Sequence, residues 1–282
     1  MYTWRKRATA DWLRVRSEEL SRQFGPALAI TERPGKARAL LEISCRTENE
    51  GQQLVREFGG SVEKLHADWL KHFAKQARSK PLRIGSRLVV QRSPDQKRPD
   101  RPVRTIIIPA ETAFGTGDHA TTAMCLRLLE QITRERPRGW SMLDAGAGSG
   151  ILAIAGSCLG AARVLAIDND PLACTVARRN ARANAVRNIE FRTGDVLNQK
   201  LTEKFDIITA NLFSEILISA LPIWSRHLAR DGSLILSGIL RWQEQEIDAG
   251  LRRNRFVVQE IWRRGKWVAL LGTRRTAQRA VT

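Results

Sequence analysis

Long apolar segments are missing from this 282-residue chain. No apolar run approaches the roughly 20 residues that a helix needs to cross a bilayer. Residues 1–7 are basic, but no apolar stretch follows them, so we expect no secretory signal there. We therefore expect a cytoplasmic protein without membrane contact. The hydrophobic fraction of 43% predicts a packed core rather than a disordered chain.

Cysteine is scarce and shows no paired spacing. The chain has four cysteines, none of which belongs to a CxxC motif: Cys45, Cys125, Cys158 and Cys174. Two of them lie in apolar segments. We interpret all four as reduced core residues and expect neither a disulfide nor a bound metal.

Acidic residues are outnumbered, and the formal net charge is +18. Residues 1–104 hold 23 Lys/Arg against 12 Asp/Glu, and residues 241–282 hold 10 against 4. The segment between them is nearly neutral, with 14 against 13. The basic flanks suit contact with a polyanion such as RNA. Solvated arginine explains them equally well, because no segment interleaves basic and aromatic residues as an RNA-reading module does.

Residues 1–66 read as a small α+β domain. We expect a strand at 12–16, a short helix from Ser17, strands at 28–32 and 39–43, a helix at 53–58 and a strand at 61–65. Thr47 and Glu50 resemble a capping box before the second helix. The order strand-helix-strand-strand-helix-strand suggests a ferredoxin-like sandwich.

Residues 67–104 read as a connector, with a helix at 68–78, a strand at 84–90 and a proline-rich loop at 92–102. Residues 105–272 then alternate between helices and strands, which predicts an open, mainly parallel, Rossmann-like sheet. A hairpin around Gly265 closes the pattern. Residues 273–282 read as a loose basic tail.

One glycine-rich motif carries the strongest chemical signal. It runs from Leu143 to Gly150, follows a predicted strand and opens a predicted helix. Glycine lets the backbone turn sharply and approach a ligand, which would then meet free N–H groups at the helix start. The GxGxG spacing differs from the GxGxxG of dinucleotide enzymes and favours a nucleoside without pyrophosphate. We expect Asp144, Gly146 and Gly148 to line this ligand.

Three polar residues follow the next strands of the predicted sheet. Asp168 lies 18 residues beyond Gly150, where a carboxylate can accept both hydroxyls of a ribose. Asp195 could reach an adenine amino group, or could simply form a turn. Asn211 ends the fourth strand, where its amide oxygen could accept protons from a nucleophilic amine. A turn-forming role for Asn211 is the alternative.

A second glycine-rich loop runs from Phe114 to Thr122 and enters a helix. It could fold over a cofactor, with threonine hydroxyls at the cofactor's polar end. His119 could act as a base because its ordinary pKa is near 6.5. We favour a role for His119 in ordering the loop.

Four segments together resemble the PrmA family of S-adenosylmethionine-dependent methyltransferases, which act on protein eleven of the large ribosomal subunit. These segments are 113–122, 144–154, 166–171 and 210–212. The likeness covers residues 68–272, and its most specific part is the AFGTGxHxTT segment. It implies a class I methyltransferase sheet, a ferredoxin-like N-terminal domain that recognises the protein substrate, and lysine side chains or α-amines as targets.

The resemblance also implies individual roles. Thr122, Gly146, Asp168 and Asn211 would contact S-adenosylmethionine, and Phe114, Gly115 and Thr116 would line it, with Asn169 beside Asp168. Asp118, Ala120 and Ala147 depart from the family's usual Thr, Pro and Cys. The prediction is a protein N-methyltransferase with Asn211 orienting the amine. An RNA methyltransferase and a non-catalytic ribosome- or RNA-binding module are the alternatives.

Overall fold

The computed structural model describes residues 2–24, 28–31, 38–45, 47–64, 81–93, 95–96, 103–109 and 119–274. The chain divides into two compact units, residues 1–75 and 76–282, which are described separately. No helix among the described residues is both long and apolar enough to span a membrane.

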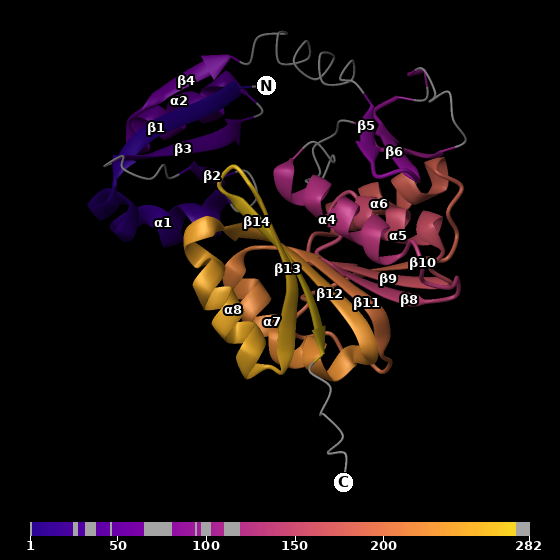
Figure 1. The fold of residues 1–282 in the computed structure, drawn as a ribbon. Coiled ribbons are helices and arrows are strands. Elements are labelled where there is room, and N and C mark those ends of the chain that lie inside the picture. The colour runs from indigo at the N-terminus through magenta and orange to yellow at the C-terminus, as the bar shows by residue number, and fades with distance from the viewer. Residues whose placement is uncertain are drawn as a thin grey trace. The chain divides into compact units, whose positions relative to one another are not determined.

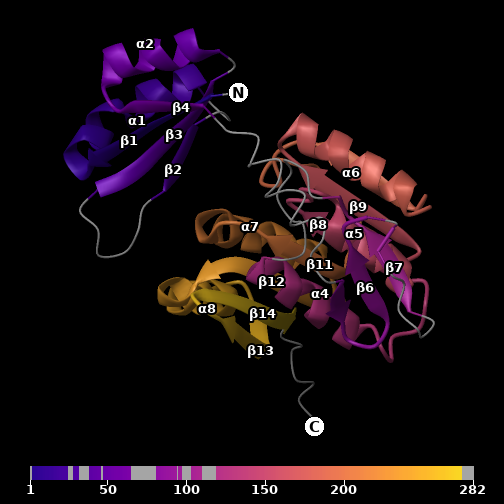
Figure 2. The same cartoon turned by 90° about the horizontal axis from the view of Figure 1, so that it is seen from above.

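The smaller unit is a four-stranded antiparallel sheet with two helices (Figure 2). Its strands lie in the order β2-β3-β1-β4, which confirms the ferredoxin-like prediction. Its elements are β1 (Tyr2–Thr9), α1 (Ala10–Phe24), β2 (Leu28–Thr31), β3 (Arg38–Cys45), α2 (Glu48–Phe58) and β4 (Ser61–Lys64). Residues of both helices pack with β1 and β3 in one apolar core.

Two details of this unit differ from the prediction. The expected strand at 12–16 lies inside α1, and the first strand is instead the basic segment β1. Leu13 and Leu20 face the core seven residues apart, a helical spacing, whereas Val15 is 72% exposed. Within β1, Arg5 is paired across the sheet with Glu42 on β3, at 2.7 Å.

A single tryptophan organises the core of the smaller unit. The Trp4 side chain is fully buried, and its Nε1 donates to the carbonyl oxygen of Gly59 at 2.8 Å. Its ring meets Phe58 edge-on, with the centroids 6.2 Å apart. The predicted cap of α2 is present, since the Thr47 hydroxyl accepts a hydrogen bond from the Glu50 amide. The helix begins directly after this cap, at Glu48, which is earlier than the predicted start at residue 53.

The larger unit starts with three short strands, β5 (Leu82–Ile84), β6 (Leu88–Gln91) and β7 (Arg104–Ile107). The expected single strand at 84–90 is a hairpin, because Gly85 turns the chain at φ +55°. Arg87 in this turn pairs with the buried carboxylate of Glu130 and donates to the Thr133 carbonyl oxygen. The hairpin is thereby fastened to the following helix. The predicted helix at 68–78 lies outside the described residues.

A seven-stranded sheet forms the body of the larger unit (Figure 1). The strand order is β10-β9-β8-β11-β12-β14-β13, and β14 runs opposite to the other six strands. The predicted hairpin around Gly265 is the turn between β13 and β14. The elements are α4 (Ala120–Ile132), β8 (Ser141–Ala145), α5 (Ile151–Leu159), β9 (Arg163–Asp168), α6 (Pro171–Ala183), β10 (Ile189–Thr193), β11 (Phe205–Asn211), α7 (Ser214–His227), β12 (Leu228–Leu240), η2 (Arg241–Gln243), α8 (Glu244–Arg253), β13 (Phe256–Arg264) and β14 (Trp267–Arg274).

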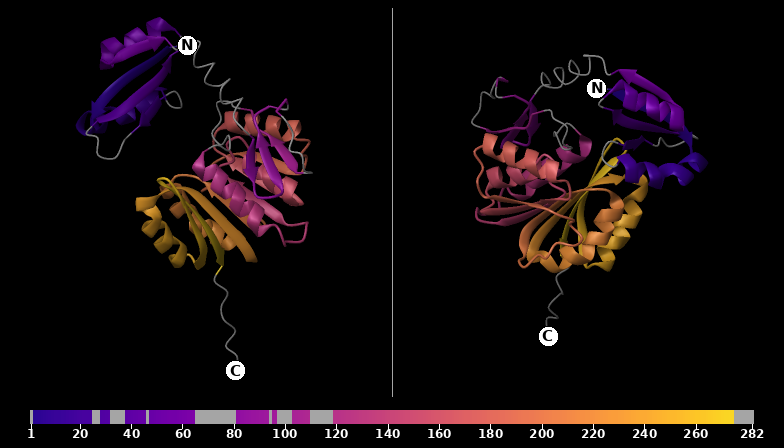
Figure 3. Two further views of the ribbon diagram at one scale, coloured as in Figure 1. Left: turned by 45° about the horizontal axis from the view of Figure 1, so that its top comes forward. Right: turned by 180° about the vertical axis from the view of Figure 1, so that it is seen from behind.

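Helices cover both faces of this sheet, so its central strands are apolar on both sides (Figure 3). Ile207 of β11 packs in the core that contains α4 and α5, on one face of the sheet. The next residue, Ile208, packs in the core that contains α7 and α8, on the other face. The predicted Rossmann-like sheet is confirmed. The strand order reverses between β8 and β11, the point at which such sheets bind ligands beyond their carboxyl ends.

Candidate functional site

The loop between β8 and α5 needs glycine at three positions. Gly146, Gly148 and Gly150 have φ of +81°, +53° and +78°, a region that L side chains rarely adopt. A Cβ on Gly146 would collide with the side chain of Leu212, and one on Gly150 would lie 2.9 Å from the Ala177 Cβ. The loop therefore presents bare backbone at the switch point of the sheet.

Several amides of this loop and of the following helix start bond within the protein. Gly146 and Ala147 both donate to the Ile167 carbonyl oxygen, at 2.8 and 3.0 Å. At the start of α5, the Ala153 amide donates to Asp144 at 3.0 Å. The expectation of free N–H groups throughout this helix start is wrong for Ala153, because a buried carboxyl caps it.

Asp168 ends β9 directly beside the glycine loop. Its Oδ2 accepts from the Gly148 amide at 2.7 Å, and its Oδ1 accepts from the Asp170 amide at 3.0 Å. The side chain is partly exposed, and a carboxylate can accept about four hydrogen bonds. Each oxygen therefore keeps capacity for a ligand hydroxyl. The two backbone bonds fix the carboxylate where a diol lying over the glycines would meet it.

Asp144 lies beneath the loop and is fully buried. Its Oδ1 accepts from the Thr209 hydroxyl at 2.7 Å, and its Oδ2 accepts from Ala153. Burial raises the pKa of Asp144 to about 7, with a further rise from Asp168, while the two hydrogen bonds oppose it. This placement favours a role in shaping the loop from below.

Asn211 ends β11 on the other side of β8. Its Nδ2 donates to the Thr122 hydroxyl at 3.2 Å, and Thr122 is buried in the first turn of α4. Among the described residues, the Asn211 Oδ1 has no hydrogen-bond partner. The bond to Thr122 therefore leaves an oriented acceptor at the carboxyl edge of the sheet.

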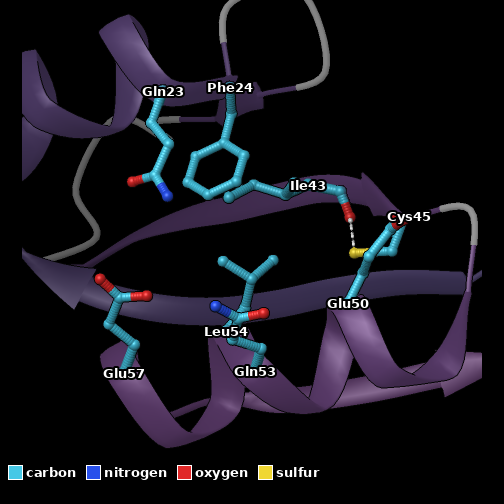
Figure 4. Close-up of a pocket in the computed structure, with 8 residues that line it drawn as sticks. All are labelled: Gln23, Phe24, Ile43, Cys45, Glu50, Gln53, Leu54 and Glu57. Atoms are coloured by element: carbon cyan, nitrogen blue, oxygen red, sulfur yellow. Dashed lines mark hydrogen bonds between the residues drawn. The ribbon is translucent and has the colours of Figure 1, made fainter.

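A cavity of about 170 Å³ lies elsewhere, in the smaller unit (Figure 4). It opens between the end of α1, β3 and α2, with Phe24, Ile43 and Leu54 among its apolar lining and Glu50 and Glu57 also against it. None of the residues that the sequence nominates for the site lines this cavity.

Comparison with known proteins places this arrangement in a family. A family profile described as ribosomal protein L11 methyltransferase (PrmA) matches residues 26–275. The chain belongs to the PrmA family. The resemblance noted in the sequence is confirmed.

Relatives in the PrmA family are 37–39% identical to this chain over the matched regions. The ribosomal protein L11 methyltransferase of Heliobacterium modesticaldum is 37% identical over 211 residues, which cover 74% of this chain and 65% of the relative. That of Pelotomaculum thermopropionicum is 39% identical over 204 residues, 72% of this chain and 64% of the relative. The matched region thus spans slightly less than two thirds of these relatives.

A crystal structure of a ribosomal protein L11 methylase from Lactobacillus delbrueckii subsp. bulgaricus has the same fold. The TM-score is 0.64 at 32% identity, over 70% of this chain and all of that chain. The class I methyltransferase sheet predicted from the resemblance is confirmed.

The other candidate site residues lie in different surroundings from Asp168 and Asn211. Phe114, Gly115 and Thr116 lie outside the described residues. Asn169 is exposed next to Asp168. Asp195 is exposed and accepts from the Leu197 amide and the Asn198 side chain, the pattern of a turn. Cofactor contact stays a prediction for all the nominated residues.

His119 makes its described contacts at the start of α4, and its role in ordering the preceding loop stays a prediction. Its Nδ1 lies 2.7 Å from the Thr121 hydroxyl, and its ring meets Trp267 edge-on at 5.0 Å. Burial lowers the pKa of His119, and the charge of Lys266 lowers it further. The neutral ring therefore secures the start of α4, the helix that carries Thr122.

Gly238 on β12 also shapes the site, although its position was not predicted from the sequence. It has φ +88°, and a Cβ there would overlap the carbonyl oxygen of Leu212, next to Asn211. The Leu212 amide donates to Ser237 at 3.1 Å. A glycine inside an apolar strand signals such a close approach of two backbones, and could have been read that way. Gly238 therefore helps to place the Asn211 turn.

Proposed function

We propose that this protein is an S-adenosylmethionine-dependent methyltransferase that acts on amines of ribosomal protein L11. Membership of the PrmA family supports the proposal. The observation that carries it is the Asp168 carboxylate, held by the Gly148 amide at 2.7 Å beside backbone that only glycine can form. This geometry suits the ribose of a nucleoside laid across the ends of β8 and β9.

The residues fit this cofactor. Asp168 would accept the ribose hydroxyls, and Gly146, which has no Cβ, lets the Leu212 side chain lie against the backbone of the loop. When bound, S-adenosylmethionine supplies a methyl group on a positively charged sulfur. Phe114, Gly115, Thr116, Thr122, Gly148, Asn169 and Asp195 remain the further proposed contacts.

Asn211 would act on the substrate amine. Its Oδ1, aimed by the bond from Nδ2 to Thr122, can accept an N–H of the amine and direct the nitrogen lone pair toward the methyl carbon. A lysine amine has an ordinary pKa near 10.4 and must be neutral to attack. Transfer from water into the site lowers this pKa, so positioning and desolvation together explain the reaction without a dedicated base.

The smaller, ferredoxin-like unit would recognise the protein substrate, in the cytoplasm where ribosomal proteins are used. The basic flanks could also contact RNA, and an RNA substrate is the rival that the assay must separate. Radiolabelled methyl transfer to purified L11 and to ribosomal RNA, measured side by side, distinguishes the two. Label in RNA alone would overturn the proposed substrate.

The cofactor assignment has its own test. Replacing Asp168 by alanine removes two charge-assisted hydrogen bonds to ligand, each worth roughly 1.5–3 kcal/mol. We expect binding of S-adenosylmethionine in calorimetry to weaken by roughly a hundredfold or more. Asp231→Ala removes an exposed carboxylate near the start of β12, at the opposite edge of the sheet, and should leave affinity unchanged. Unchanged affinity in Asp168→Ala would refute the ribose assignment.

A further inference from the structure

Two large aromatic side chains are held open to solvent at the carboxyl edge of the sheet. Phe213 and Trp242 are each 72% exposed, more than any other large hydrophobic residue described in the larger unit. Burying such rings contributes strongly to folding and binding, so large rings are mostly covered.

Both residues follow adjacent strands on the side where Asn211 lies. Phe213 comes two residues after Asn211 at the end of β11, and Trp242 comes two residues after the end of β12. These strands are parallel, and Asn211 pairs with Ser237. The two rings therefore project from neighbouring turns at one edge of the sheet, next to the proposed amine site.

Hydrogen bonds fasten the two turns to each other. The Ser214 hydroxyl donates to Gln243 Oε1 at 2.8 Å, and the Leu240 amide donates to the same oxygen at 3.0 Å. Ser214 directly follows Phe213, Gln243 directly follows Trp242, and both bonding residues are buried. An aromatic side chain on a fixed backbone loses little conformational entropy on binding.

We infer that Phe213 and Trp242 form an aromatic rim that grips the amine-bearing side chain of the protein substrate. The inference rests on the proposed function and names the residues that select its substrate. An aliphatic stem can lie against the rings, and an ammonium group is attracted to their faces before it loses its proton. Phe213 and Trp242 would act as specificity-determining residues, because they hold the chain that Asn211 then orients.

Charge beside the two rings is mixed. Exposed Glu215 follows Phe213 by two residues, whereas exposed Arg241 directly precedes Trp242. A nucleobase could also stack on these rings, so charge does not choose between a protein amine and RNA. Position favours the amine, because Phe213 lies two residues from Asn211, the residue proposed to orient it.

Kinetics of methyl transfer to purified L11 test the inference. We expect Phe213→Ala and Trp242→Ala each to raise KM for L11 by roughly tenfold, as loss of an aromatic anchor does at interfaces. The kcat and the affinity for S-adenosylmethionine should stay within about twofold, and Trp242→Phe should recover most of the loss. Val257→Ala is the control, because Val257 is an exposed apolar residue near the start of β13, at the opposite edge.

The outcomes separate the inference from the proposed function. Unchanged KM in both alanine variants of an active enzyme would overturn the rim. An equal loss in kcat and cofactor affinity would also overturn it, because it would indicate a general structural defect. Wild-type protein that binds S-adenosylmethionine but does not methylate L11 would overturn the proposed function, and the inference with it.

Discussion

Asp144 should make the stability of the larger unit depend on pH in an unusual direction. Its carboxyl is fully buried beneath the glycine loop, and burial raises its pKa from 3.8 to about 7. The folded state therefore holds this proton more tightly than the unfolded chain does. The stabilisation is complete below pH 3.8 and is lost progressively as the pH rises to about 7. Most paired carboxylates contribute with the opposite sign.

The size of the effect follows from the difference in pKa. Each pKa unit corresponds to roughly 1.4 kcal/mol, so the full difference is roughly 4 kcal/mol. Of this contribution to the free energy of unfolding, roughly 2–3 kcal/mol is lost between pH 5 and 8. The Asp144→Asn side chain cannot ionise, so the variant should not show this loss. The free energy of unfolding of the variant, relative to wild type, should therefore rise by that amount across this interval.

Urea denaturation at several pH values between 5 and 8 measures this difference. Thr209→Val removes the hydroxyl that donates to the carboxylate, so it should raise the pKa of Asp144 further and shift the loss to higher pH. Thr209→Ser keeps the hydroxyl and is the matched control. A difference between Asp144→Asn and wild type that stays flat from pH 5 to 8 would show that the carboxyl is ionised throughout, and would refute the reasoning.

Three further predictions concern the loop, the hairpin and the amine site. Gly146→Ala should weaken binding of S-adenosylmethionine by at least roughly tenfold in calorimetry, because its Cβ would meet Leu212; Gly139→Ala, at φ +106° with nothing within 4 Å, should leave binding unchanged. Burial alone would raise the pKa of Glu130, but bonds from its two arginine partners hold that pKa below its ordinary value, so its stabilisation is present at neutral pH and is lost as the pH falls below about 4. Glu130→Gln should therefore cost roughly 2–4 kcal/mol in thermal unfolding at pH 7 and less at pH 3.5, and an equal cost at both would contradict this. Asn211→Ala should lower kcat roughly a hundredfold with cofactor affinity nearly unchanged, and a purely cofactor-binding defect in calorimetry would argue against its role with the amine.

The sequence predicted the architecture well where spacing is long and regular. Alternating helices and strands in residues 105–272 indicated the parallel sheet, whose central strands are apolar on both faces. Short segments were harder. Residues 12–16 alternate like a strand, yet they belong to a helix whose apolar residues recur over a longer interval than five residues can reveal.

For the site, the sequence predicted which polar residues lie at the strand ends, but not which of them are buried beneath the loop. Asp168 and Asn211 were found because polar residues at the carboxyl ends of parallel strands converge. The burial of Asp144 was not found, since its partners Ala153 and Thr209 come from two other elements. Hydrogen bonds between distant segments leave no local pattern, so a carboxylate that faces a ligand and one that supports the loop look alike in the sequence.

Leu212 shows how these distant segments fix the site together. Its side chain fills the space where Gly146 would carry a Cβ, and its backbone fills the corresponding space at Gly238. Gly146, after β8, and Gly238, near the end of β12, thus both make room for Leu212, the residue that follows Asn211. Because both glycines also have positive φ, neither accepts another residue without strain. The position of the Asn211 amide is therefore set by the same close packing that leaves the glycine loop bare, so the amine site and the cofactor site are parts of one packed structure.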